Sequence, residues 1–243
     1  MKKLMMLLAV LASLPVMAQW GLWEKVEGNG RVQKENRQVG NFTAISSSGS
    51  WDVMVAYGES GSIQVEGDEN LLEYIETKVD DGKLVIRARK SYNLRSKNKI
   101  TIYVSLTRLT GVSLSGSGDI LGDGKFSNEG TTEFKLSGSG KIRMGIHKIK
   151  TAELAISGSG NISLSGSANA VNIRISGSGN ADCSSLITEN AAAHVSGSGN
   201  IKINANNRID ASISGSGNIS YQGAASAITK RVSGSGRLVK SQG

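Results

Sequence analysis

The residue types that most often carry out catalysis are few in this chain of 243 residues, and they are scattered. The sequence contains one cysteine, Cys183, and two histidines, His147 and His194. A cysteine nucleophile needs a base beside it, and a zinc site needs three or four ligands. A single cysteine also excludes an intramolecular disulfide. The sequence therefore indicates neither thiol catalysis nor a metal site, and we expect no cofactor.

Cleavage of a glycan is the other chemistry to consider, because a pair of carboxylates can perform it. Such a pair needs acidic residues at equivalent positions of neighbouring segments. Asp182 and Asp210 instead fall at different positions within the units of the repeat that is described below. Four glutamates of the C-terminal half also fall at different positions of the repeat, namely Glu129, Glu133, Glu153 and Glu189. We predict that the protein is not an enzyme, and a polysaccharide-cleaving enzyme is the less favoured alternative.

A basic segment is the clearest candidate for a binding site. It holds six cations within 13 residues, with no acid among them. The six are Arg87, Arg89, Lys90, Arg95, Lys97 and Lys99. Such a run favours an anionic ligand, for example a charged glycan or lipopolysaccharide phosphate. The alternative is a solvated turn that keeps a sheet edge from aggregating. Nucleic acid is not an expected partner, because few aromatic residues are available to stack on bases.

A repeat in the C-terminal half must position most of these side chains. The tetrapeptide Ser-Gly-Ser-Gly occurs seven times, at intervals of 22, 20, 19, 20, 18 and 19 residues. It starts at Ser115, Ser137, Ser157, Ser176, Ser196, Ser214 and Ser233. A chain with 31 glycines and 35 serines would otherwise suggest flexibility. Because the motif keeps a regular spacing, it predicts an ordered repeat instead.

The repeat has the two-residue periodicity of β-strands. Leu114 and Ile120 flank the first motif six positions apart, so in an extended chain they face the same side. The same alternation places Cys183 on the inward side, so we predict that it is a buried structural thiol. It places His194 on the outward side. Outward serines and asparagines should stack in ladders. A unit of about 20 residues with this pattern predicts one coil of a β-solenoid.

The sequence leaves the local role of the motif open. Ser-Gly-Ser-Gly either continues a strand, with glycine allowing close approach of a neighbouring backbone, or forms a corner with glycine at positive φ. Both alternatives fit the same spacing.

The N-terminal part follows a different pattern. Lys2 and Lys3 precede an apolar run and small residues before Ala18, which is typical of a cleaved signal peptide, and no later segment is long enough to span a membrane. Without the two lysines, 26 basic and 20 acidic residues remain. We predict a signal peptide at 1–18, a lead segment at 19–37 and one solenoid domain at 38–243. That domain comprises N-terminal strands and a cap at 38–110 and the repeats at 111–243.

Within residues 30–110 we predict strands and no copy of the repeat in register. The expected strands are residues 42–45, 51–56, 62–66, 83–89 and 99–106. A short helix is expected at 69–77. Because a solenoid end exposes unpaired strand edges, this region should cap it.

Several short stretches of this chain resemble a known family. They are Arg37–Ile45, Gly49–Val53 and Asp81–Ile86, followed by the Ser-Gly-Ser-Gly coils. Their order is similar to that of the head GIN domain of putative auto-transporter adhesins, a family of secreted proteins common in Bacteroidetes. The resemblance covers about residues 38–225. It implies an all-β, right-handed parallel β-helix, a surface or envelope location and no catalytic residues.

These observations lead to a functional prediction. We expect a non-enzymatic, exported protein of the periplasm or cell surface that binds or adheres to a surface glycan or an envelope protein. The alternative is a structural envelope component that forms homo-oligomers through the ends of its solenoid.

Overall fold

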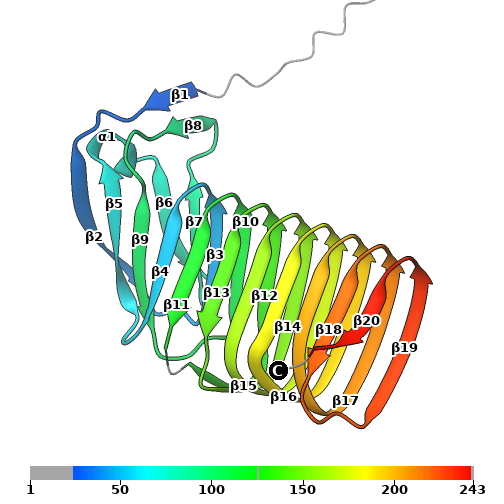
Figure 1. The fold of residues 1–243 in the computed structure, drawn as a ribbon. Helices are drawn as coiled ribbons and strands as arrows, with labels where there is room; N and C mark the ends of the chain where they lie inside the picture. The colour runs from blue at the N-terminus through cyan, green and yellow to red at the C-terminus, as the bar shows by residue number, and fades with distance from the viewer. Residues whose placement is uncertain (1–23, 125, 242–243) are drawn as a thin grey trace, which may run out of the picture.

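The structure is a computed structural model that describes residues 24–124 and 126–241. In this part of the chain almost all regular structure is β-strand, and the strands form a flattened stack of coils (Figure 1). The predicted signal peptide at 1–18 lies outside the described residues. No helix among the described residues is long and apolar enough to cross a membrane.

Each coil contributes one strand to each of two faces. Face 1 contains, in spatial order, β7 (Lys83–Ala88), β3 (Ala44–Gly49), β10 (Gly111–Gly116), β12 (Ser127–Gly138), β14 (Lys148–Gly158), the second halves of β15 (Asn161–Gly177), β16 (Asn180–Gly197) and β17 (Asn200–Gly215), and β19 (Ala227–Gly234). Face 2 contains β9 (Thr101–Leu106), β4 (Asp52–Tyr57), β11 (Asp119–Asp123), β13 (Lys141–Gly145), the first halves of β15 to β17, β18 (Asn218–Gln222) and β20 (Arg237–Lys240). All these neighbours pair in parallel, so the predicted parallel β-solenoid is confirmed.

The Ser-Gly-Ser-Gly motif forms the corner between the two faces. Its first glycine has φ between +117° and +126° in all seven copies, a region that favours glycine. The second glycine is buried in six of the seven copies, and a Cβ on Gly179 would lie 2.5 Å from the carbonyl oxygen of Gly160 in the preceding coil. The backbone N–H of Gly179 donates a hydrogen bond to the carbonyl oxygen of Gly158 at 2.9 Å. Of the two alternatives that the sequence left open, the structure therefore shows the corner.

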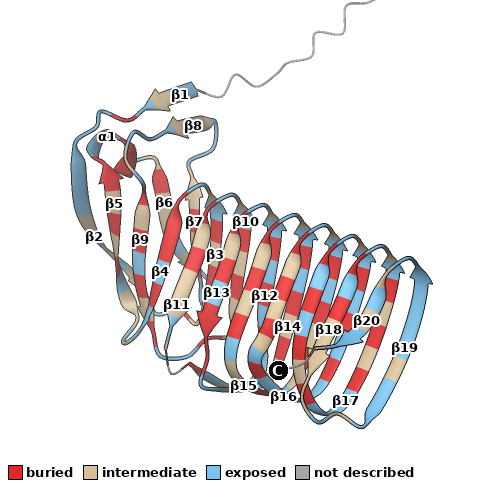
Figure 2. Ribbon diagram, viewed as in Figure 1, coloured by how far each residue is buried: buried red, intermediate tan, exposed pale blue. Residues whose placement is uncertain are grey.

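The core lies between the faces and follows the predicted parity. Figure 2 shows buried residues alternating with exposed ones along the coils. Leu114 and Ile120 are buried as expected, and Cys183 is fully buried. The last described coil departs from the pattern, since Val232 occupies an inward position but is 39% exposed.

The first coil is a copy of the repeat that the sequence prediction missed. Strand β3 pairs with β10 in register, which aligns Ser48 with Ser115 and Gly49 with the first glycine of that motif. Trp51 replaces the second glycine, its ring packs over Gly49, and its Nε1–H donates to Ser47 Oγ at 2.9 Å. The prediction that residues 30–110 contain no copy in register is wrong.

The coil made of β3 and β4 lies between two others. On one side it pairs with β7 and β9, and on the other with β10 and β11, although β7 and β9 come later in the chain than β3 and β4. The chain therefore passes outward to the N-terminal end and returns before it begins the regular coils.

Antiparallel strands lie at the N-terminal end of the solenoid. β5 (Gly61–Asp68) pairs with β9, β2 (Val32–Gly40) pairs with β5, and β6 (Ile75–Asp80) pairs with β7. Strand β2 spans the predicted boundary between residues 37 and 38. The helix predicted at 69–77 is confined to α1 (Glu69–Leu72), because the chain turns there and enters β6. A separate two-stranded sheet joins β1 (Glu24–Glu27) to β8 (Tyr92–Arg95).

Polar ladders run along the solenoid beside the corner. Asn180 donates its side-chain amide to Asn161 at 2.9 Å, Asn200 donates to Asn180 at 3.0 Å, and Asn218 donates to Asn200 at 3.2 Å. The first serines of successive motifs also stand in register, all on the exposed side of face 1. The predicted ladders are therefore present.

Candidate functional site

The structure divides the basic segment into paired and exposed cations. Arg87, at the end of β7, binds both carboxylate oxygens of Glu76 at 3.0 and 3.1 Å, and its hydrogen bonds hold the pKa of Glu76 below the ordinary value. Lys99 contacts Asp52 at 2.6 Å, which raises the pKa of the lysine. These two side chains are therefore already neutralised within the fold.

The other four cations of the segment are exposed around β8. They are Arg89, Lys90, Arg95 and Lys97. Strand β1 brings Glu27 beside them: a hydrogen bond from Lys25 is the main cause of its lowered pKa, and Lys97 and Arg95 lower it further. The structure thus keeps four exposed cations at one end of the molecule, with acidic side chains close by.

The scattered nucleophile and bases stay apart. Burial raises the pKa of the Cys183 thiol to about 12, so the reactive thiolate is suppressed. His194 is exposed on face 1, in register with Arg174, and Cys183 points into the core from face 2. The structure does not bring these groups together.

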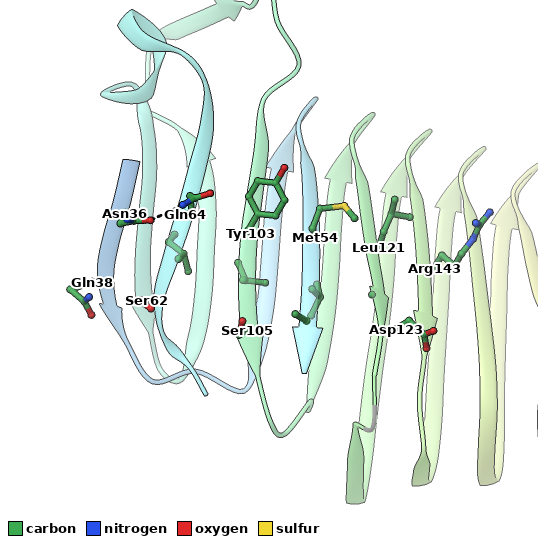
Figure 3. A pocket seen from close by; sticks show the side chains of 15 residues that line it. Asn36, Gln38, Met54, Ser62, Gln64, Tyr103, Ser105, Leu121, Asp123 and Arg143 are labelled. Atoms are coloured by element: carbon green, nitrogen blue, oxygen red, sulfur yellow. Dashed lines mark hydrogen bonds between the residues drawn. The ribbon is translucent and has the colours of Figure 1, made fainter. Parts of the chain in front are cut away.

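A hollow of about 970 Å³ lies on the outer surface of face 2, near the N-terminal end (Figure 3). A row of outward side chains forms its floor. The residues of this row are partners in register on neighbouring strands. The row runs Asn36, Gln64, Tyr103, Met54, Leu121 and Arg143, and we call these six residues the platform. Because paired strands lie about 4.8 Å apart, the row follows the solenoid axis in even steps.

The middle of the platform is apolar and held in place. Tyr103 is 40% exposed and Met54 is 38% exposed. The Tyr103 hydroxyl donates to Glu66 at 3.0 Å, which raises the pKa of the tyrosine, and Lys34 Nζ lies 5.8 Å from the centre of the ring. These contacts hold the orientation of the ring.

The two ends of the platform are polar. Gln64 donates its amide to Asn36 Oδ1 at 2.9 Å, which leaves the Asn36 amide hydrogens and the Gln64 carbonyl for other partners. At the opposite end Arg143 is exposed on β13, with Leu121 and Ser163 as its neighbours in the row. Asp123 lies on the rim of the hollow (Figure 3).

Comparison with known proteins assigns the chain to a family. The family model described as "Putative auto-transporter adhesin, head GIN domain" matches residues 41–225, more than half of the chain. The chain belongs to the head GIN domain family. A comparison with curated proteins finds no match.

Solved structures share the fold of this head GIN domain. A protein of Bacteroides fragilis described as a "putative adhesin" superposes with a TM-score of 0.82 at 22% identity, covering 89% of this chain and all of that one. A "putative adhesin" of Parabacteroides merdae gives 0.71 at 23% identity, and a "putative lipid binding protein" of Parabacteroides distasonis gives 0.71 at 24%; each covers 90% of this chain and all of its own. The family and these relatives carry adhesin or binding names, and none is named as an enzyme.

The head GIN domain has a second hollow, of about 610 Å³, on the outer surface of face 1. Exposed serines line it together with Lys135, Arg174 and His194. Lys135 is already paired with Glu133 of its own strand at 2.6 Å. This surface offers hydroxyl groups, and no tyrosine, phenylalanine or tryptophan lines it.

Sequence reasoning missed the platform for a physical reason. Its residues come from strands β2, β5, β9, β4, β11 and β13, most of them outside the regular repeat. An available signal was the outward parity of three apolar side chains, Met54, Tyr103 and Leu121, since outward positions of a solvated face are usually polar.

Proposed function

We propose that the protein is a non-enzymatic, exported binding module of the cell envelope or cell surface, and that it binds a glycan chain on the platform. The observation that carries the proposal is the fixed, half-exposed ring of Tyr103, set between amides on one side and an arginine on the other. Six adjacent strands support these groups, so the surface is ordered before binding.

The chemistry of the platform matches that of a sugar chain. A sugar ring has an apolar C–H face and a polar edge of hydroxyl groups. Tyr103 and Met54 offer apolar area to the face, and the amides of Asn36 and Gln64 offer donors and acceptors to the edge. Binding sites of this kind combine an apolar lining with a few placed polar groups.

The test is a glycan array probed with the wild-type protein and with Tyr103→Ala. We expect Tyr103→Ala to bind the glycans that wild type binds at least about tenfold more weakly, which corresponds to about 1.4 kcal/mol. Val239→Ala is the matched control, because Val239 is 50% exposed at the far end of the same face and lies outside the hollow. Equal binding by Tyr103→Ala and wild type would disprove the proposal, and so would a release of reducing ends from bound polysaccharide.

The four exposed cations around β8 are proposed as a separate contact for anionic groups of the envelope. They lie around β8, which pairs with β1, and do not line the hollow of the platform. Their replacement by alanine should therefore weaken binding to charged surfaces at low salt and leave Tyr103-dependent binding unchanged. Arg87 and Lys99, which bind Glu76 and Asp52, would join this contact only by exchanging those partners. Binding that does not depend on salt would contradict the proposal.

The last described coil supports self-association as a second candidate function. Val232 and Ile228 are 39% and 41% exposed on β19, although equivalent residues in earlier coils are buried. A second copy stacked on this coil would cover them. Light scattering across a hundredfold range of concentration tests the idea, and a monomer at every concentration would exclude it.

A further inference from the structure

We infer that the platform selects a glycan that carries a carboxylate, such as a uronic acid chain, and that Arg143 recognises this group. The inference rests on the proposed function, since it names the ligand class of the same site. It makes Arg143 a specificity-determining residue, while Tyr103 provides the contact with the sugar ring.

Arg143 is the cation of the platform that the fold leaves for a ligand. It is exposed, and none of the ion pairs among the described residues involves it. Its guanidinium offers a planar fork of donors that matches a carboxylate in two parallel hydrogen bonds. A sugar hydroxyl would use only part of this fork.

The acidic side chains around Arg143 are already engaged or lie in another row. Asp119 faces Lys141, at 4.0 Å, and Asp182 contacts Lys202 at 3.5 Å and the Ser184 hydroxyl at 2.6 Å. Asp123 lies two residues beyond Leu121 on β11, outside the row of the platform, and its carboxylate packs against Gly145. The carboxylate that completes the fork of Arg143 is therefore expected to come from outside the chain.

The spacing of the platform sets a length requirement for the ligand. Tyr103 and Arg143 are separated by three strand steps through β4 and β11, or about 14 Å. A ligand that uses both residues must run along the solenoid axis, across the strands. A single uronic acid is too short to contact both, whereas a chain of several sugars can do so.

The experiment compares oligosaccharides of glucuronic or galacturonic acid with the same oligosaccharides after reduction of their carboxyl groups. Titration calorimetry measures both with wild type, Arg143→Gln, Arg143→Lys and Tyr103→Ala. We expect wild type to prefer the acidic form by about tenfold, which equals about 1.4 kcal/mol. Arg143→Gln should remove the preference while keeping the affinity for the reduced form, and Arg143→Lys should keep part of it. A uronic acid monosaccharide should show no dependence on Arg143.

The outcomes separate the two proposals. If wild type binds both forms equally, or if Arg143→Gln keeps the preference, the carboxylate inference is wrong and the glycan proposal stands. If no tested chain binds, or if Tyr103→Ala binds like wild type, the platform is not a glycan site and both fail. Because Arg143 is exposed, its variants should unfold at the wild-type temperature, and a thermal scan checks this.

Discussion

The carboxylate of Asp68, at the end of β5, accepts a hydrogen bond from the backbone N–H of Lys97 at 2.7 Å, in the loop before β9. The same fully buried carboxylate accepts from the backbone N–H of Asn98 at 3.2 Å and from its side-chain amide at 2.6 Å. One side chain thus ties the end of β5 to the loop that carries Lys97, one of the four exposed cations.

Replacement of Asp68 by alanine should destabilise the fold strongly. The change leaves part-buried N–H groups without an acceptor and empties the buried site of the carboxylate, and we expect a loss of about 3 kcal/mol in the free energy of unfolding. Urea titration measures the loss. Asp210→Ala is the control, because Asp210 makes a long, exposed contact with Arg231 at 3.4 Å and should cost less than about 1 kcal/mol. Equal losses for the two variants would contradict this account.

The stabilisation by Asp68 should depend on pH. Burial acts to raise the pKa of this carboxyl, but hydrogen bonds from Asn98, Lys97 and Gly30 outweigh it and leave the pKa lowered in the folded protein. A lowered folded-state pKa stabilises the protein above the unfolded value of about 3.9 and loses this effect as the pH falls through the folded value. The stability difference between wild type and Asp68→Asn should therefore be constant at neutral pH and shrink below about pH 4. Chemical denaturation at pH 7, 5, 4 and 3 measures it, and a difference that grows on acidification would refute the assignment.

Gly179→Ala tests the corner. A Cβ at this position would lie 2.5 Å from the Gly160 carbonyl oxygen and 2.6 Å from Ile156 Cγ2, and neither can move without shifting a coil. We expect a loss of about 3 kcal/mol, or failure to fold. Gly130→Ala is the control, since its nearest neighbour would be the Asn128 side chain at 3.6 Å. Thermal unfolding of both variants decides the matter, and a stable Gly179→Ala protein would rule out the corner packing.

The asparagine ladder predicts a graded effect of position. Asn180→Ala removes two amide hydrogen bonds, those with Asn161 and Asn200, whereas Asn218→Ala removes only the bond to Asn200. At about 1 kcal/mol for each bond, the first variant should lose about twice as much stability as the second. Urea unfolding compares them, and equal losses would mean that the ladder bonds contribute little.

Cys183 should be inert in the folded protein. Its burial and its pKa of about 12 predict no reaction with maleimide at pH 8 in buffer and full reaction in 6–8 M urea. Mass spectrometry of the labelled chain reports both states. Rapid labelling without denaturant would place the thiol at the surface and reverse the assignment of the inward side.

The sequence was most informative where structure depends on local spacing. Leu114, Ile120 and Cys183 could be placed in the core because parity along a strand is a property of a few neighbouring residues. The first coil was missed because Trp51 fills the place of a glycine, which hides the motif. The ion pair of Lys99 with Asp52 could not be foreseen either, since β4 and β9 are distant in sequence and no short pattern specifies their pairing. The pair of Arg87 with Glu76 lies across the β6–β7 hairpin, and the two-residue turn Asp81-Gly82 was an available signal for it. The platform could not be foreseen because three of its six residues lie on β2, β5 and β9, whose antiparallel pairings join distant parts of the sequence.

The position of the β3–β4 coil also constrains the order of folding. Its neighbours on one side are β7 and β9 and on the other β10 and β11, so its strands cannot complete their hydrogen bonds until residues up to 123 are available. The later coils need only partners about 20 residues away, and such local contacts form faster than distant ones. A chain delivered N-terminus first would therefore hold its opening strands partly unpaired until Asp123 has emerged, and the platform would stay incomplete until Arg143 follows.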